Sequence, residues 1–98
     1  MQIVTEFKDR VRIVFPGADI YFYGSRVTGK HREDSDYDLL VVLGEVNSQT
    51  RNTIYDIAWE IGFAHDVFIS PVLAAMEEFT HMTVSPFYNN VKQHGWVL

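Results

Sequence analysis

The run Leu39-Leu40-Val41-Val42-Leu43 constrains the fold of this chain more than any other feature. Five consecutive aliphatic residues cannot alternate between a buried and a solvated face, so a strand built from them must be covered on both sides. We therefore predict a central strand over residues 37–43 that ends at Gly44. The run is far shorter than the roughly 20 apolar residues of a membrane-spanning helix, so we expect no membrane segment.

The other sequence patterns place helices and short strands around this strand. The predicted elements are a helix over residues 5–15, a strand over 20–23, a polar loop over 24–35 with a helical turn after Ser25, a helix from Asn47 or Ser48 to Gly62, a strand over 65–69, a short helix beginning at Ser70-Pro71, and a helix from Ser85-Pro86 to Gly95. Interleaved helices and strands predict an α/β (α+β) fold, a small mixed three-stranded sheet with helices packed on it. The tight polar loop lets the first two strands pair antiparallel.

Length and composition narrow the possible functions. The 98 residues fit one domain, which we assign to residues 1–98. The absence of cysteine excludes disulfides, thiolate metal sites and a cysteine nucleophile, and it suits the cytoplasm, where we expect the protein. A net charge of −5 repels a phosphate backbone, so long nucleic acid is not an expected partner.

Two aspartates at the start of the central strand are the first candidate site residues. Asp36 and Asp38 are two residues apart, so their side chains point to the same side, with α-carbons about 6.5–7 Å apart. Such a pair persists most easily with a divalent cation between the carboxylates, and oxygen ligands suit Mg²⁺ or Mn²⁺. Asp66, at the start of the third predicted strand, could complete a three-aspartate cluster able to hold two ions.

The polar loop before these aspartates has the residues of a phosphate site. Gly24 and Ser25 follow a strand and open a helical turn, so backbone N–H groups and the Ser25 hydroxyl could receive a phosphate. Arg26 makes the turn locally basic, as do Lys30, His31 and Arg32 further along. Gly29 allows the loop to turn back toward the aspartates. A nucleoside triphosphate carried by a metal ion fits between these two halves.

The combined motif resembles the nucleotidyltransferase signature of the DNA polymerase beta superfamily, most closely its minimal nucleotidyltransferase (MNT) branch. The matching residues are Gly24-Ser25-Arg26-Val27-Thr28-Gly29, five intervening residues, Ser35-Asp36-Tyr37-Asp38-Leu39-Leu40-Val41-Val42, the later His65-Asp66-Val67-Phe68, and the ending from Ser85-Pro86-Phe87-Tyr88 to Gly95-Trp96-Val97-Leu98. Val27 and Thr28 depart from the alanine and arginine of many minimal members, which bears on nucleotide affinity.

The resemblance implies the following roles. Asp36, Asp38 and Asp66 would be the catalytic and metal-binding acids, with Mg²⁺ or Mn²⁺, and Asp66 would help to activate the acceptor hydroxyl. Gly24 and Ser25 would hold the β- and γ-phosphates of the ATP substrate, beside Arg26 and Gly29. Minimal members are implied to transfer AMP from ATP, several of them to a tyrosine of a HEPN-type toxin partner, and so to act as antitoxins.

Other interpretations remain open at this stage. The chain could neutralise a partner by occlusion without turnover. A small-molecule nucleotidyltransferase would ordinarily need an added substrate domain. The acceptor site could come from a partner protein or from a second copy of the chain, as a homo-oligomer. The spacing from Asp34 to Glu45 imitates a calcium-binding EF-hand loop, but Leu39 stands where that loop requires glycine.

Overall fold

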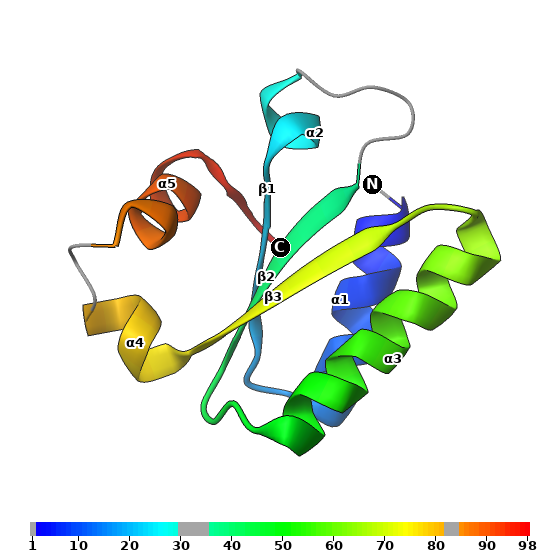
Figure 1. Cartoon of the computed structure of the whole chain (residues 1–98), viewed down its shortest axis with the longest axis horizontal. Coiled ribbons are helices and arrows are strands. Elements are labelled where there is room, and N and C mark those ends of the chain that lie inside the picture. The colour runs from blue at the N-terminus through cyan, green and yellow to red at the C-terminus, as the bar shows by residue number, and fades with distance from the viewer. Residues whose placement is uncertain (1, 30–35, 82–84) are drawn as a thin grey trace.

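A computed structural model describes residues 2–29, 36–81 and 85–98 of the chain. Helices and strands alternate along most of its length (Figure 1). The elements are α1 (Gln2–Val14), β1 (Asp19–Tyr23), α2 (Ser25–Thr28), β2 (Tyr37–Leu43), α3 (Ser48–His65), β3 (Ile69–Ala75), α4 (Met76–His81), α5 (Pro86–His94) and β4 (Trp96–Val97). No helix within the described ranges is long and apolar enough to cross a membrane.

The sheet has the strand order β3-β2-β1-β4. β1 pairs antiparallel with β2, as predicted, and β2 pairs parallel with β3 over seven residue pairs, from Tyr37 opposite Ile69 to Leu43 opposite Ala75. The predicted count of three strands is wrong by one, because Trp96 and Val97 add a short antiparallel strand beside β1. Two residues are too few to show an alternating pattern in the sequence, so this strand is recognised only from its pairing with β1. The mixed α/β class is confirmed.

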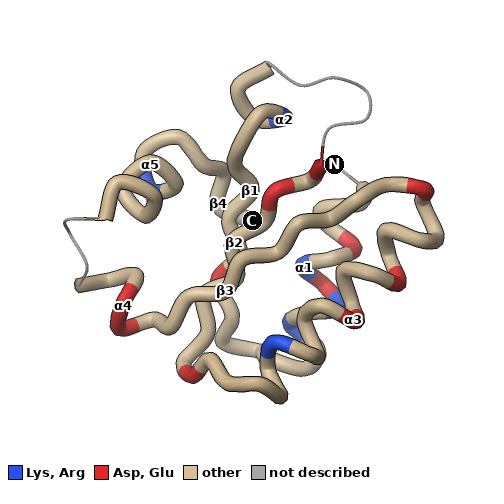
Figure 2. Tube along the Cα trace, in the orientation of Figure 1, with Lys and Arg blue, Asp and Glu red and all other residues tan. Residues whose placement is uncertain are grey.

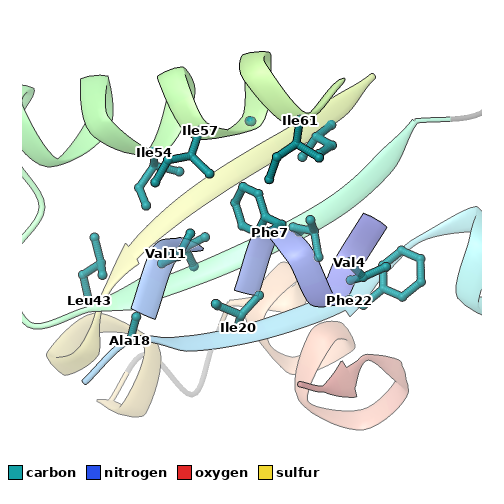
Figure 3. Packing of buried hydrophobic residues seen from close by; sticks show 14 residues of the cluster. Val4, Phe7, Val11, Ala18, Ile20, Phe22, Leu43, Ile54, Ile57 and Ile61 are labelled. Atoms are coloured by element: carbon teal, nitrogen blue, oxygen red, sulfur yellow. The ribbon is translucent and has the colours of Figure 1, made fainter. Parts of the chain in front are cut away.

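The central strand β2 is covered on both faces, which explains its unbroken apolar run. Leu39 and Val41 are fully buried in a cluster with residues of α1 and α3, among them Phe7 and Ile57 (Figure 3). Leu40 and Val42 are fully buried on the opposite face. That second cluster also contains Ala74 of β3, Phe79 of α4 and Val91 of α5. Figure 1 shows the same arrangement, with α1 and α3 on one side of the sheet and α4 and α5 on the other.

The helix ends follow local capping signals. Asn47 caps α3 and forms a capping box, in which its side chain accepts from the Thr50 N–H at 3.0 Å and its own N–H donates to the Thr50 hydroxyl at 2.8 Å. Ser85 caps α5, with Pro86 in the first turn, and Gly95 follows its last residue, as predicted. The first helix is shifted from the predicted 5–15 to Gln2–Val14.

The segment after the second long helix differs most from the prediction. α3 continues past Gly62 to His65, and Asp66 caps it in the left-handed conformation, with φ 55° and ψ 46°. The predicted strand over 65–69 and the predicted helix at Ser70-Pro71 are therefore both wrong, because Ser70 and Pro71 lie inside β3. Pairing with β2 overrides the local helix-start signal there.

The sheet tolerates Pro71 because β3 is an edge strand. The Tyr37 N–H donates to the Phe68 carbonyl at 2.9 Å, so in this parallel register the even-numbered backbone groups of β3 face β2. The missing N–H of Pro71 then falls on the free edge, where no ladder bond is lost.

Candidate functional site

The turn between β1 and α2 is built on Gly24. Its backbone has φ 88° and ψ −159°, a region that essentially only glycine adopts. Its carbonyl accepts from the N–H groups of Val27 and Thr28 at 3.1 and 3.2 Å, which closes the helical turn predicted after Ser25. The turn also directs the chain past the start of β2.

Gly24 lies directly against the carboxylate of Asp38. A β-carbon at residue 24 would stand 2.2 Å from Asp38 Oδ2 and 3.1 Å from Asp38 Cγ, so a larger residue would displace this carboxylate. Asp38 is opposite Tyr23 in the β1–β2 register, which brings the end of one strand to the start of the other. The structure thus brings together the predicted phosphate-binding turn and one of the predicted metal ligands.

The two aspartates at the start of β2 influence each other. Burial, and to a smaller extent the negative charge of Asp36, raise the pKa of Asp38 above its ordinary value. Burial and the Asp38 carboxylate raise the pKa of Tyr23 to about 12. Figure 2 shows the acidic positions at the start of β2 beside α2. A partly buried carboxylate next to a second one is a donor set that fits a hard divalent cation.

Asp66 does not join this pair. It is an exposed residue at the end of α3, and α3 packs on the face of the sheet that carries Leu39 and Val41. Asp38 has the same strand parity as Leu40 and Val42, so it belongs to the opposite face. No group of three His, Cys, Asp or Glu residues suited to a metal ion occurs within residues 2–29, 36–81 and 85–98. The described residues therefore do not show the expected three-aspartate cluster, and the metal-binding role of Asp66 stays a prediction.

Arg26 also lies toward the face of α3. Its guanidinium stacks over the Tyr37 ring, 4.0 Å from the centroid, and it lines a groove of about 830 Å³ together with Asp66 and the aromatic pair Trp59 and Phe63. Those two rings stack at 5.2 Å and are largely exposed. Neither Gly24 nor Asp38 lines this groove, so it is separate from the Gly24–Asp38 contact.

Ser70 is the residue at this end of β3 that sequence reasoning missed. It is opposite Asp38 in the parallel register. Residues directly opposite each other in a sheet project to the same face, so Ser70 lies beside Asp38. The strand period could have identified Ser70 only if β3 had been predicted to begin at Ile69.

The remaining predicted residues have mixed outcomes. Gly29 ends α2 in the left-handed conformation, with φ 77°. The Thr28 hydroxyl donates to carbonyls of its own turn, at 3.4 Å to Gly24 and 3.3 Å to Ser25. Lys30, His31, Arg32 and Asp34 lie outside the described residues. The EF-hand alternative is excluded, because Leu39 is a fully buried strand residue.

Comparisons with known proteins bear on the family and the fold of this chain. The family model described as nucleotidyltransferase domain matches residues 1–93, nearly the whole chain. The chain belongs to the nucleotidyltransferase domain family. The predicted resemblance to that family is confirmed. A search of curated proteins found no match.

Three solved structures that are similar in fold to this chain are of toxin–antitoxin proteins. One chain, from a toxin–antitoxin structure with AMP-PNP, has a TM-score of 0.63 and 20% identity, over 98% of this chain and 68% of that chain. A chain from a mutant of the toxin–antitoxin pair MntA-HpeT has a TM-score of 0.59 and 18% identity, over 98% and 68%. A second MntA-HpeT mutant gives 0.53 and 19%, over 99% and 68%. These likenesses establish the fold.

Proposed function

We propose that this chain binds a nucleoside triphosphate with a divalent cation, Mg²⁺ or Mn²⁺, and transfers the nucleoside monophosphate to a hydroxyl group of a protein partner. The nucleotide is ATP and the transferred group is AMP. The partner is a toxin of the HEPN type, the acceptor is one of its tyrosines, and the chain acts as its antitoxin.

The contact between Gly24 and Asp38 carries this proposal. The turn that would receive the phosphates stands against the carboxylate that would bind the cation, and the close approach depends on glycine. A triphosphate bound at the turn and a cation bound at the aspartates would therefore meet. Membership of the nucleotidyltransferase family supports the same assignment.

Each residue of the site has a distinct part in the proposal. The backbone of Gly24 and the hydroxyl of Ser25 bind and orient the phosphates, and Asp36 and Asp38 hold the cation. When bound, the cation supplies neutralisation of the charge that develops on the transferred phosphoryl group. Phosphoryl transfer depends mainly on positioning and charge, so a small domain suffices for this part of the reaction.

The proposed partner rests on two observations. The similar chains come from toxin–antitoxin structures, one of them with AMP-PNP. This chain has 98 residues and a net charge of −5, which favours a protein acceptor over RNA. The acceptor hydroxyl would be held by the partner.

The test is transfer of label from α-³²P-ATP to the co-encoded partner in the presence of Mg²⁺. We expect labelled partner with the wild-type chain and a loss of about 100-fold or more with Asp36→Asn. Asp9→Asn is the matched control, since Asp9 is an exposed aspartate of α1, and it should label as the wild type does. Equal labelling by Asp36→Asn and wild type would contradict the proposal.

A second candidate function is neutralisation of the partner by occlusion, without transfer. The absence of a three-acid group in the described residues, and a serine opposite Asp38, favour it. Under this alternative Asp36→Asn and Asp38→Asn would still neutralise the partner in a growth assay. Under the transferase proposal both variants would fail to do so.

A further inference from the structure

The parallel pairing of β2 with β3 defines which side chain stands next to Asp38. Asp38 is opposite Ser70, and the next pairs on the same face are Leu40 with Val72 and Val42 with Ala74. Leu40, Val42 and Ala74 share one buried cluster, which confirms that the even-numbered residues of both strands face the same side. Ser70 is partly buried, and its hydroxyl has no hydrogen-bond partner among the described residues.

Asp66 is separated from this position by both sequence and orientation. Three residues lie between Ser70 and the left-handed turn at Asp66, and the turn belongs to α3 on the other face. Asp66 lines the groove beside Phe63 and Pro71, on the side of α3. A carboxylate held there cannot replace the side chain at residue 70.

We infer that Ser70, not Asp66, is the β3 residue that faces the cation, so this site holds its cation with two carboxylates and a neutral hydroxyl. The inference rests on the proposed function, which supplies the cation. Asp36 and Asp38 together carry the charge that one divalent cation balances. A hydroxyl adds no charge and is a poor base, so Ser70 does not take the proton of the acceptor hydroxyl, which goes to water or to a basic group other than Ser70.

Binding of Mn²⁺ alone, measured from the loss of the free-ion signal in electron paramagnetic resonance, tests the inference. We expect Ser70→Asp to lower the Mn²⁺ dissociation constant about 10-fold or more, because a third carboxylate joins the site. Ser48→Asp introduces the same charge at an exposed position of α3. This control should change the Mn²⁺ dissociation constant by less than about 2-fold. Asp66→Asn should leave Mn²⁺ binding unchanged.

The outcomes separate this inference from the proposed function. If Asp66→Asn weakened Mn²⁺ binding as much as Asp38→Asn, or a folded Ser70→Asp bound no more tightly than wild type, the assignment of Ser70 would be wrong. If Ser70→Asp did not fold, the comparison of Asp66→Asn with Asp38→Asn would decide alone. If Asp36→Asn and Asp38→Asn both bound Mn²⁺ like the wild type, the proposed function itself would fail.

Discussion

At the scale of single residues, Gly24 has a backbone conformation and a neighbour that both require glycine. Its φ of 88° with ψ −159° is nearly closed to other residues, and Asp38 occupies the space of a β-carbon. Gly29 has a positive φ of 77° but nothing within 4 Å of its β-carbon position. Substitution of Gly29 therefore tests the effect of backbone strain alone, and substitution of Gly24 tests strain combined with a steric clash.

We expect Gly24→Ala to lower the free energy of unfolding by about 1–3 kcal/mol and to weaken nucleotide binding, because Asp38 must move. Gly29→Ala should cost about 1 kcal/mol, as a single residue in the left-handed region does. Urea unfolding and titration with a fluorescent ATP analogue would measure both effects. Nucleotide binding by Gly24→Ala at wild-type affinity would contradict the proposed contact.

Asp38 itself should oppose folding at neutral pH. Its pKa is higher in the folded chain than its ordinary 3.8, because burial and Asp36 disfavour the charged form. The stability that the wild type loses relative to Asp38→Asn is thus smallest at pH values below 3.8. This loss grows as the pH rises through the raised pKa of Asp38.

We predict that Asp38→Asn raises the free energy of unfolding at neutral pH by less than about 1 kcal/mol, since solvent screens a partly exposed pair. The difference should shrink as the pH falls and approach zero well below pH 3.8, where the carboxyl group is protonated in both states. Urea unfolding at several pH values measures it. A destabilised Asp38→Asn at neutral pH would show that Asp38 makes a favourable interaction in the free protein.

At the scale of elements, the end of α3 decides what Asp66 does. A non-glycine residue in the left-handed conformation carries a backbone cost, and glycine is the preferred residue at this helix position. If Asp66 only terminates α3, the chain with glycine at residue 66 should have a higher free energy of unfolding than the chain with aspartate.

We therefore expect Asp66→Gly to raise the free energy of unfolding by about 0.5–1 kcal/mol and Asp66→Ala to lower it by a similar amount. Thermal and urea unfolding would show whether each variant is more or less stable than the wild type. A metal ligand would show a different pattern, in which Mn²⁺ stabilises the wild type but neither variant.

At the scale of the whole molecule, the two layers of helices divide the core between the faces of β2. Leu39 is buried against α1 and α3, whereas Leu40 is buried against α4 and α5. Among the described residues, the buried cluster around Leu40 is smaller than the one around Leu39, so the stability that Leu40 contributes tests whether the second layer is packed.

Both Leu39→Ala and Leu40→Ala should lower the free energy of unfolding by about 2–5 kcal/mol, the range for fully buried leucines. Val72→Ala, at a residue with 36% exposure on β3, should cost about 1 kcal/mol or less. Denaturant titrations would rank the three variants. If Leu40→Ala cost no more than Val72→Ala, α4 and α5 would not form a packed second layer.

The sequence alone predicted the features that local physics controls. The apolar run of β2, the capping residues Asn47 and Ser85, and the helical turn after Ser25 are visible in short stretches of chain, and each was confirmed. The acidic pair and the glycine turn were also visible, because their spacing along the chain is itself the signal.

Tertiary structure decided where β3 begins. Ser70-Pro71 resembles a helix start, yet the ladder with β2 makes it a strand, and the free edge accommodates the proline. That register places Ser70 next to Asp38 and leaves Asp66 at the end of α3. Which side chain faces a neighbouring strand depends on long-range pairing, and a shift of a few residues moves a side chain to another face or out of the sheet.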